Sequence, residues 1–161
     1  MNNIEPITNS IRNENHRLYV DITTRNINTG ATGVYGTNSD FTLKNISLPL
    51  DSSKKYTVKV DSLIYKNVNV AADAFLTVLS DIGEEIIVNN KTSSILYRSN
   101  IPLSSTDYII RDSSNNSAFK LPLKSTTINS IRCVSSRSDN GALVALDVAS
   151  TVTIILLIEE E

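Results

Sequence analysis

The C-terminal stretch STVTIILLIEEE, residues 150–161, constrains the fold more than any other part of the sequence. Its aliphatic centre, residues 154–158, is far shorter than the about 20 apolar residues that a membrane-spanning helix needs, so we expect no membrane span. Side chains branched at Cβ dominate residues 151–155, and they fit a pleated sheet better than a helix. Because a chain end is normally loose and exposed, an apolar strand there has to be held between other strands. We therefore predict a buried strand at the end of the chain.

Both faces of this predicted strand become apolar toward its end. Ile155 and Leu157 lie on one face together with two threonines. The opposite face consists of Val152, Ile154, Leu156 and Ile158. In a two-sheet sandwich only one face of a strand contacts the core, so Ile155 and Leu157 would be exposed to water unless something covers them. The cover could be the chain's own N-terminal arm or a neighbouring subunit, and a core strand with a patchy outer side fits equally well. Ile155 and Leu157 are therefore the candidate assembly residues.

Composition and charge exclude several classes of protein. A chain of 161 residues, 40% hydrophobic and 20% charged, is typical of one globular domain. The abundance of Asn, Ser and Thr favours turns and strands over helix interiors. A net charge of -2 creates no field that would gather phosphate, so we expect no direct nucleic-acid partner. Cys133 is the single cysteine and no secretory signal is visible, which excludes an internal disulfide and indicates a reducing cytosol.

The N-terminal half shows where the ordered domain begins. Residues 1–17 are polar without an apolar period, and we predict a flexible N-terminal arm there. Residues 18–23 alternate between apolar and polar side chains, the pattern of a half-buried strand, and residues 28–40 are rich in Gly, Asn and Thr, typical of a loop. We predict that the β domain spans residues 18–158 and that residues 159–161 form an acidic C-terminal tail.

Further strands follow at short intervals. Residues 41–50 alternate in two phases that slip at Lys44 and Asn45, which predicts one strand with a β-bulge. A strand over 56–65 follows a turn, and Asp139-Asn140-Gly141 predicts a type I′ hairpin. That hairpin would join residues 128–134 to residues 143–146. Shorter candidate strands lie at 75–79, 85–88, 95–97, 108–111 and 119–121, and we pair the first two as a hairpin. Many short strands without a helical period indicate an all-β sandwich or barrel.

The order of these features resembles a known family. A polar arm leads into LYVDITTR at 18–25, and a Gly-rich and Asn-rich loop leads into SDFTL at 39–43 and LPL at 48–50. YTVKVDSL follows at 56–63, and near the end an Asp-Asn-Gly hairpin leads into the closing apolar strand. This order resembles the single jelly-roll capsid proteins of double-stranded DNA viruses, in particular the penton and minor capsid proteins of virophages and their polinton-like relatives.

The resemblance implies a single jelly-roll β-sandwich of two four-stranded antiparallel sheets. It also implies that the last strand lies beside the first core strand, here residues 41–50. The implied function is that of a structural subunit that forms a homopentamer at the vertices of an icosahedral shell, next to a major capsid protein. The implied location is the virion, assembled in the host cell cytoplasm, with no enzymatic activity and no cofactor.

Residues that could carry chemistry are few. His16 is the only histidine and lies in the predicted arm, while Cys133 lies within a predicted strand, so a Cys-His pair, a serine triad and a zinc site are all poorly supported. Carboxylates that could act as paired acids or as Ca²⁺ ligands fall near turns, where charges are usually solvated: Asp81, Glu84, Glu85, Asp107 and Asp112. We therefore predict no catalytic, cofactor or metal site.

The alternative function is a carbohydrate-binding or receptor-binding β-sandwich, such as a trimeric spike or head domain. Aromatic side chains could line a sugar site by stacking, although most of them fall at strand positions where packing is the better expectation. These tyrosines are Tyr19, Tyr35, Tyr56, Tyr65, Tyr97 and Tyr108.

Overall fold

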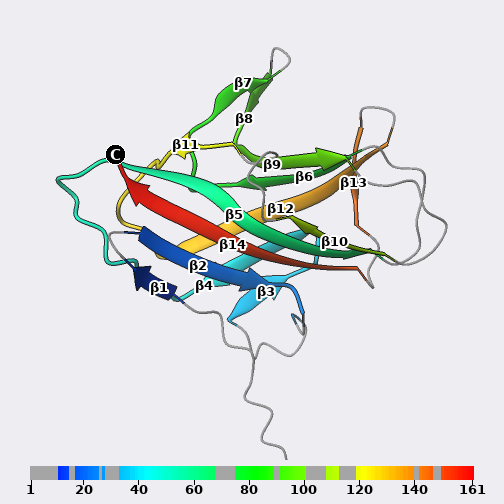
Figure 1. The fold of residues 1–161 in the computed structure, drawn as a ribbon, viewed down its shortest axis with the longest axis horizontal. Coiled ribbons are helices and arrows are strands. Elements are labelled where there is room, and N and C mark those ends of the chain that lie inside the picture. Colours follow the sequence, from blue (N-terminus) through cyan, green and yellow to red (C-terminus); the bar gives the residue numbers. More distant parts are fainter. Residues whose placement is uncertain are drawn as a thin grey trace, which may run out of the picture.

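Two antiparallel sheets face each other in this computed structural model and enclose one apolar core (Figure 1). The structure describes residues 11–14, 17–25, 27, 33–67, 75–88, 91–100, 108–112, 119–139, 142–146 and 150–161. No helix in this part of the chain is both long and apolar enough to cross a bilayer.

The first sheet has the strand order β1-β2-β14-β5-β10, and β11 also pairs with β5. Its strands are β1 (Ile11–Glu14), β2 (Arg17–Thr23), β5 (Tyr56–Asn67), β10 (Tyr108–Asp112), β11 (Leu121–Pro122) and β14 (Thr151–Glu160). The last strand of the chain therefore occupies the middle of this sheet.

The second sheet has the order β3-β4-β12-β6-β9, and β13 also pairs with β12. Its strands are β3 (Val34–Gly36), β4 (Asp40–Lys44), β6 (Phe75–Ser80), β9 (Ile95–Asn100), β12 (Ser130–Asp139) and β13 (Ala142–Ala145). A separate hairpin of β7 (Ile86–Val88) and β8 (Lys91–Ser93) extends away from the two sheets (Figure 1).

Eight of these strands form the predicted jelly roll. The four-stranded sets β2-β14-β5-β10 and β4-β12-β6-β9 face each other, and all of their pairings are antiparallel. β1, β3, β11 and β13 then enlarge each set to six strands. The all-β jelly-roll prediction is confirmed.

The core lies between the two sheets and is built by period-2 alternation. On β14, Val152, Ile154, Leu156 and Ile158 are all at most 1% exposed. Residues on the neighbouring strands of the same sheet complete this layer, and they are Leu18, Val20, Ile22, Val58, Val60, Leu63 and Tyr65. Phe41, Leu43, Leu76, Val78, Ile131 and Cys133 meet them from the second sheet.

A β-bulge corrects the phase of the long strand β5. Ile155 pairs with Ser62 and Leu156 pairs with Val60, so Asp61 is the extra residue. The bulge allows the apolar positions to change from even to odd numbers while Val60 and Leu63 both stay buried. Without it, a one-residue slip would turn one half of the strand outward.

Residues 11–14 and 17 of the expected arm and residues 159–160 of the expected tail belong to strands, while residues 1–10 of the arm lie outside the described residues. Ile11–Glu14 forms β1 and pairs antiparallel with β2, and Arg17 already belongs to β2. Glu159 and Glu160 continue β14, with Glu159 opposite Arg17 and Glu160 opposite Tyr56. The described sheet is thus longer at both ends than the sequence pattern indicated, because charged residues can continue a ladder whose hydrogen bonds come from the backbone.

The prediction of one bulged strand over 41–50 is wrong. β4 ends at Lys44, and Asn45 adopts a left-handed conformation with φ of 58°. Residues 46–50 form no strand, although Leu48 is buried and Ile46 and Leu50 pack against the core. The expected neighbour of the last strand is wrong as well, because β4 lies in the second sheet beside β12 and β14 lies between β2 and β5.

Two local pairings also differ from expectation. The predicted loop 28–40 contains β3. Gly36, at the end of β3, has a φ of 113°, and a Cβ atom at this position would collide with the Asp40 carbonyl oxygen. β7 pairs with β8 rather than with β6, which pairs with β9 and β12. By contrast, Asp139 pairs with Ala142, so the hairpin between β12 and β13 is confirmed, while Asn140 and Gly141 of its turn lie outside the described residues.

We expect Leu156→Ala to cost about 2–5 kcal/mol of unfolding free energy, because it removes a fully buried side chain from the middle strand of the first sheet. Ile64→Ala is the matched control on β5, where the side chain is 44% exposed, and it should cost much less. Urea unfolding of both variants at one protein concentration checks this. Equal losses for the two variants would contradict the assignment of the inner face.

Candidate assembly surface

The outer face of the first sheet carries the two residues singled out from the sequence. Ile155 lies between Asp21 of β2 and Ser62 of β5, and it is half-buried. Leu157 lies between Tyr19 and Lys59 on the same face and is only 3% exposed. The long side chains that flank Leu157 on both neighbouring strands explain this low exposure.

The expectation that both residues would be wet in a lone subunit therefore needs correction for Leu157. The chain itself covers Leu157, whereas Ile155 keeps part of its surface accessible. Neither observation tests a role in assembly, which remains a prediction for this pair.

One further apolar side chain extends this surface. Ile64 of β5 is 44% exposed and lies opposite Thr153, whose hydroxyl group shares a 2.9 Å hydrogen bond with that of Thr23 on β2. We use the name outer patch for Tyr19, Ile64, Thr153, Ile155 and Leu157. The sequence did contain a signal for Ile64, because the inward positions Val60 and Leu63 are three positions apart instead of the two of regular alternation.

Charged residues border the outer patch where β14 ends. The Glu159 carboxylate forms an ion pair with Arg17 at 3.0 Å and lies 3.7 Å from the Lys120 ammonium group. Glu160 binds Lys54 at 2.8 Å, and this hydrogen-bonded contact raises the pKa of Lys54. These glutamates, expected to form a free tail, instead fasten the end of β14 to other parts of the chain.

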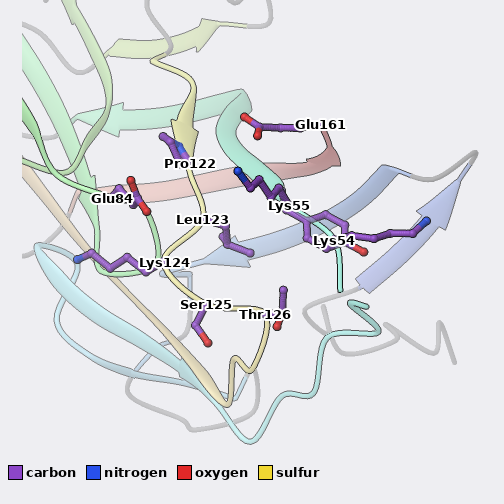
Figure 2. A pocket seen from close by; sticks show the side chains of 10 residues that line it. Lys54, Lys55, Glu84, Pro122, Leu123, Lys124, Ser125, Thr126 and Glu161 are labelled. Atoms are coloured by element: carbon purple, nitrogen blue, oxygen red, sulfur yellow. The ribbon is translucent and has the colours of Figure 1, made fainter. Parts of the chain in front are cut away.

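A hollow of about 530 Å³ lies next to this end of the sandwich (Figure 2). Figure 2 shows Lys55 and Glu161 on one side of it and Glu84 and Lys124 on the other. Its remaining lining consists of Lys54, Tyr56, Pro122, Leu123, Ser125 and Thr126. With three lysines, two glutamates and one of the lysines already bound to Glu160, the hollow has no marked excess of either charge.

Those residues considered for catalysis that the structure describes do not form a reactive group. Cys133 is fully buried in β12, and burial raises the pKa of its thiol to about 12, which keeps it protonated and unreactive. The Asp81 carboxylate accepts a hydrogen bond from the backbone N–H of Arg132 at 2.9 Å, so it links the end of β6 to β12. Glu84 and Glu85 are exposed. His16, Asp107 and the side chain of Asp112 lie outside the described residues.

No group of three or more potential metal ligands occurs among the residues that the structure describes. The tyrosines do not gather into a stacking platform within the same part of the chain. Tyr65 and Tyr97 are buried in the core, and the exposed ring of Tyr35 lies under the Lys44 ammonium group at 5.1 Å. The side chain of Tyr108 lies outside the described residues.

The outer face of the second sheet is held by an ion pair across β4 and β12. Arg132 donates two hydrogen bonds to the Asp40 carboxylate, at 2.8 Å from Nε and 2.6 Å from Nη2. The hydrogen bond from Arg132 holds the pKa of Asp40 below its usual value. This face also carries apolar side chains, namely the exposed Tyr35 and the half-buried Leu79 and Val134.

Known proteins resemble this chain in structure but not in sequence. No family model and no curated protein matches it. The solved crystal structure of the selenomethionine-labelled mavirus penton protein is similar, with a TM-score of 0.66 and 8% sequence identity, and the match covers 90% of this chain and 99% of that chain. The chain has a penton-like jelly-roll fold. At this level of identity the likeness shows the fold alone.

We expect the contribution of the Asp40–Arg132 pair to stability to depend on pH. Because the folded-state pKa of Asp40 lies below 3.8, the usual value for an aspartate, the contribution is present above that value and disappears as the pH falls through the lowered pKa. Arg132→Gln should therefore lower the unfolding free energy slightly at pH 7, and the difference from the wild type should shrink as the pH is lowered below 3.8, as measured by urea unfolding across this range. A difference that persists unchanged at the lowest pH would contradict the pairing.

Proposed function

We propose that this chain is a structural subunit of a viral capsid that acts as a penton or a related minor component. The observation that carries the proposal is the fold shared with the mavirus penton protein over 99% of that chain. A β-sandwich by itself hosts many functions, so the extent of the match matters more than the fold class. Within such proteins we propose the virophage and polinton-like group, because of its resemblance to the motifs described above.

The proposed subunit works by association with copies of itself. A homopentamer at the vertices of an icosahedral shell, beside a neighbouring major capsid protein, follows from the penton role. The location is then the virion, with assembly in the host cell cytoplasm. A structural role also agrees with the exposed but unclustered carboxylates Glu84 and Glu85, and with the inert thiol of Cys133.

The outer patch is the surface that we propose for contact between subunits or with the major capsid protein. Ile64 and Ile155 combine accessible apolar area with rigid support, because both sit on paired strands near the centre of a sheet. Apolar area surrounded by charged residues such as Lys66 and Arg17 is the usual composition of an interface core and its rim. Leu157, already 3% exposed, would support the neighbouring residues rather than contact a partner directly.

We expect the purified full-length chain to have the mass of five copies in native mass spectrometry and to form five-membered rings by electron microscopy. A trimer, or a monomer that binds glycans on an array, would contradict the penton role and favour the alternative of a receptor-binding or carbohydrate-binding sandwich.

We expect Ile155→Lys to weaken association at least tenfold while the subunit stays folded. The new ammonium group lies opposite Asp21, which favours the folded monomer, but burial of the charge at an interface would be costly. Ser130→Asp, at an exposed position on the outer face of the second sheet, is the control and should assemble as the wild type does. Sedimentation velocity measures association, and thermal unfolding confirms the fold. Unchanged assembly of Ile155→Lys would exclude the outer patch as the interface.

A further inference from the structure

We propose that assembly depends on the synthesis of β14, because the second sheet has no middle strand before residues 130–139 are available and the first sheet has none before residues 151–160 are available. The link to assembly rests on the proposed function, whereas the order of folding follows from topology alone.

The middle strand of each sheet comes from residues 130–160, after all of its neighbours on the path. β14 is the third of five strands in the order β1-β2-β14-β5-β10, and β12 is the third in the order β3-β4-β12-β6-β9. Without them the first sheet separates into β1-β2 and β5-β10, with only the two-residue β11 added to β5, and the second separates into β3-β4 and β6-β9. Isolated two-stranded units are marginally stable in water at best. A chain that stops before residue 130 therefore has no stable sheet to build on.

The core has the same dependence. Ile131 and Cys133 of β12 and Ile154, Leu156 and Ile158 of β14 are all at most 1% exposed and lie at the centre of the sandwich. Their absence leaves the apolar residues of β2 and β5 without neighbours on one side, so burial there cannot offset the loss of chain entropy. Folding should thus be all-or-none and should wait for the last strand.

The outer patch is also incomplete until β14 inserts. Its residues come from three adjacent strands, with Tyr19 on β2, Ile64 on β5 and Ile155 on the strand between them. A truncated chain cannot present this surface and cannot enter a shell as a defective subunit. Insertion of β14 and competence for assembly then become one event.

The glutamates at the end of β14 oppose aggregation of this strand before it has folded. Residues 151–158 are uncharged, lack proline and have high β-propensity, which is the composition of an aggregation-prone segment. Glu159, Glu160 and Glu161 follow directly and oppose self-association by charge. After insertion, Glu159 and Glu160 acquire their partners Arg17 and Lys54.

The test uses the full chain tethered to stalled ribosomes through flexible C-terminal linkers of graded length. We expect resistance to a protease to appear in a single step, only when the linker is long enough to bring residues 150–161 out of the exit tunnel. Leu156→Asp, which places a charge at a fully buried position, should remain sensitive at every linker length and shows that resistance reports the native fold. Thr153→Ser, at a half-buried position on the outer face, should follow the wild type.

Resistance that appears while β14 is still inside the tunnel would overturn the inference, whatever the mass of the released chain. A single late step supports it. The released chain is then sized separately, and a protected monomer would contradict the proposed function but not the order of folding.

Discussion

The pairing of β14 with β2 on one side and β5 on the other is the interaction on which the rest of the structure depends. β14 is registered against β5 from Thr151 to Glu160 and against β2 from Thr153 to Glu159. The beginning of β14 is held by two hydrogen bonds to Thr24. The Thr24 N–H donates to the Val152 carbonyl at 2.8 Å, and the Val152 N–H donates to the Thr24 hydroxyl at 2.9 Å. At the other end, ion pairs hold Glu159 and Glu160. A strand fixed at both ends and along both edges unites two halves of the sheet that have no other shared strand.

Local patterns in the sequence predicted where most strands lie, but they did not predict which strands pair with each other. Alternation located β2, β5 and β14, and the Asp-Asn-Gly signal located the hairpin of β12 and β13, because these signals depend on neighbours in the chain. The predicted neighbour of β14, residues 41–50, was wrong, since period-2 patterning shows which side of a strand is apolar but not which strand lies beside it. The prediction of one strand over residues 41–50 was wrong for a different reason. Its apolar residues do pack inward, but Asn45 turns the backbone after Lys44, and side-chain pattern alone cannot distinguish a bulge from the end of a strand.

The candidate surface was only partly predictable. The sequence placed Ile155 and Leu157 on the outer face correctly, yet the burial of Leu157 depends on Tyr19 and Lys59, which register brings to it from distant segments. Ile64 was missed because the bulge at Asp61 reverses the phase of β5. The glutamates expected to extend into water are bound instead by Arg17, Lys120 and Lys54, and these partners could not be found before the ends of the sheets were placed. A penton-like fold at 8% identity illustrates the same division, since alternation and strand order can persist while individual residues change.

Native-state hydrogen exchange of the full-length protein tests the central role of β14 most directly. If β14 holds the first sheet together, the amides of residues 152–158 should be among the slowest in the chain, and they should exchange only through global unfolding together with those of β2 and β5. Fast exchange of residues 152–158, or their exchange at a lower free energy than β2 and β5, would show that the last strand is an addition to a sandwich that is stable without it.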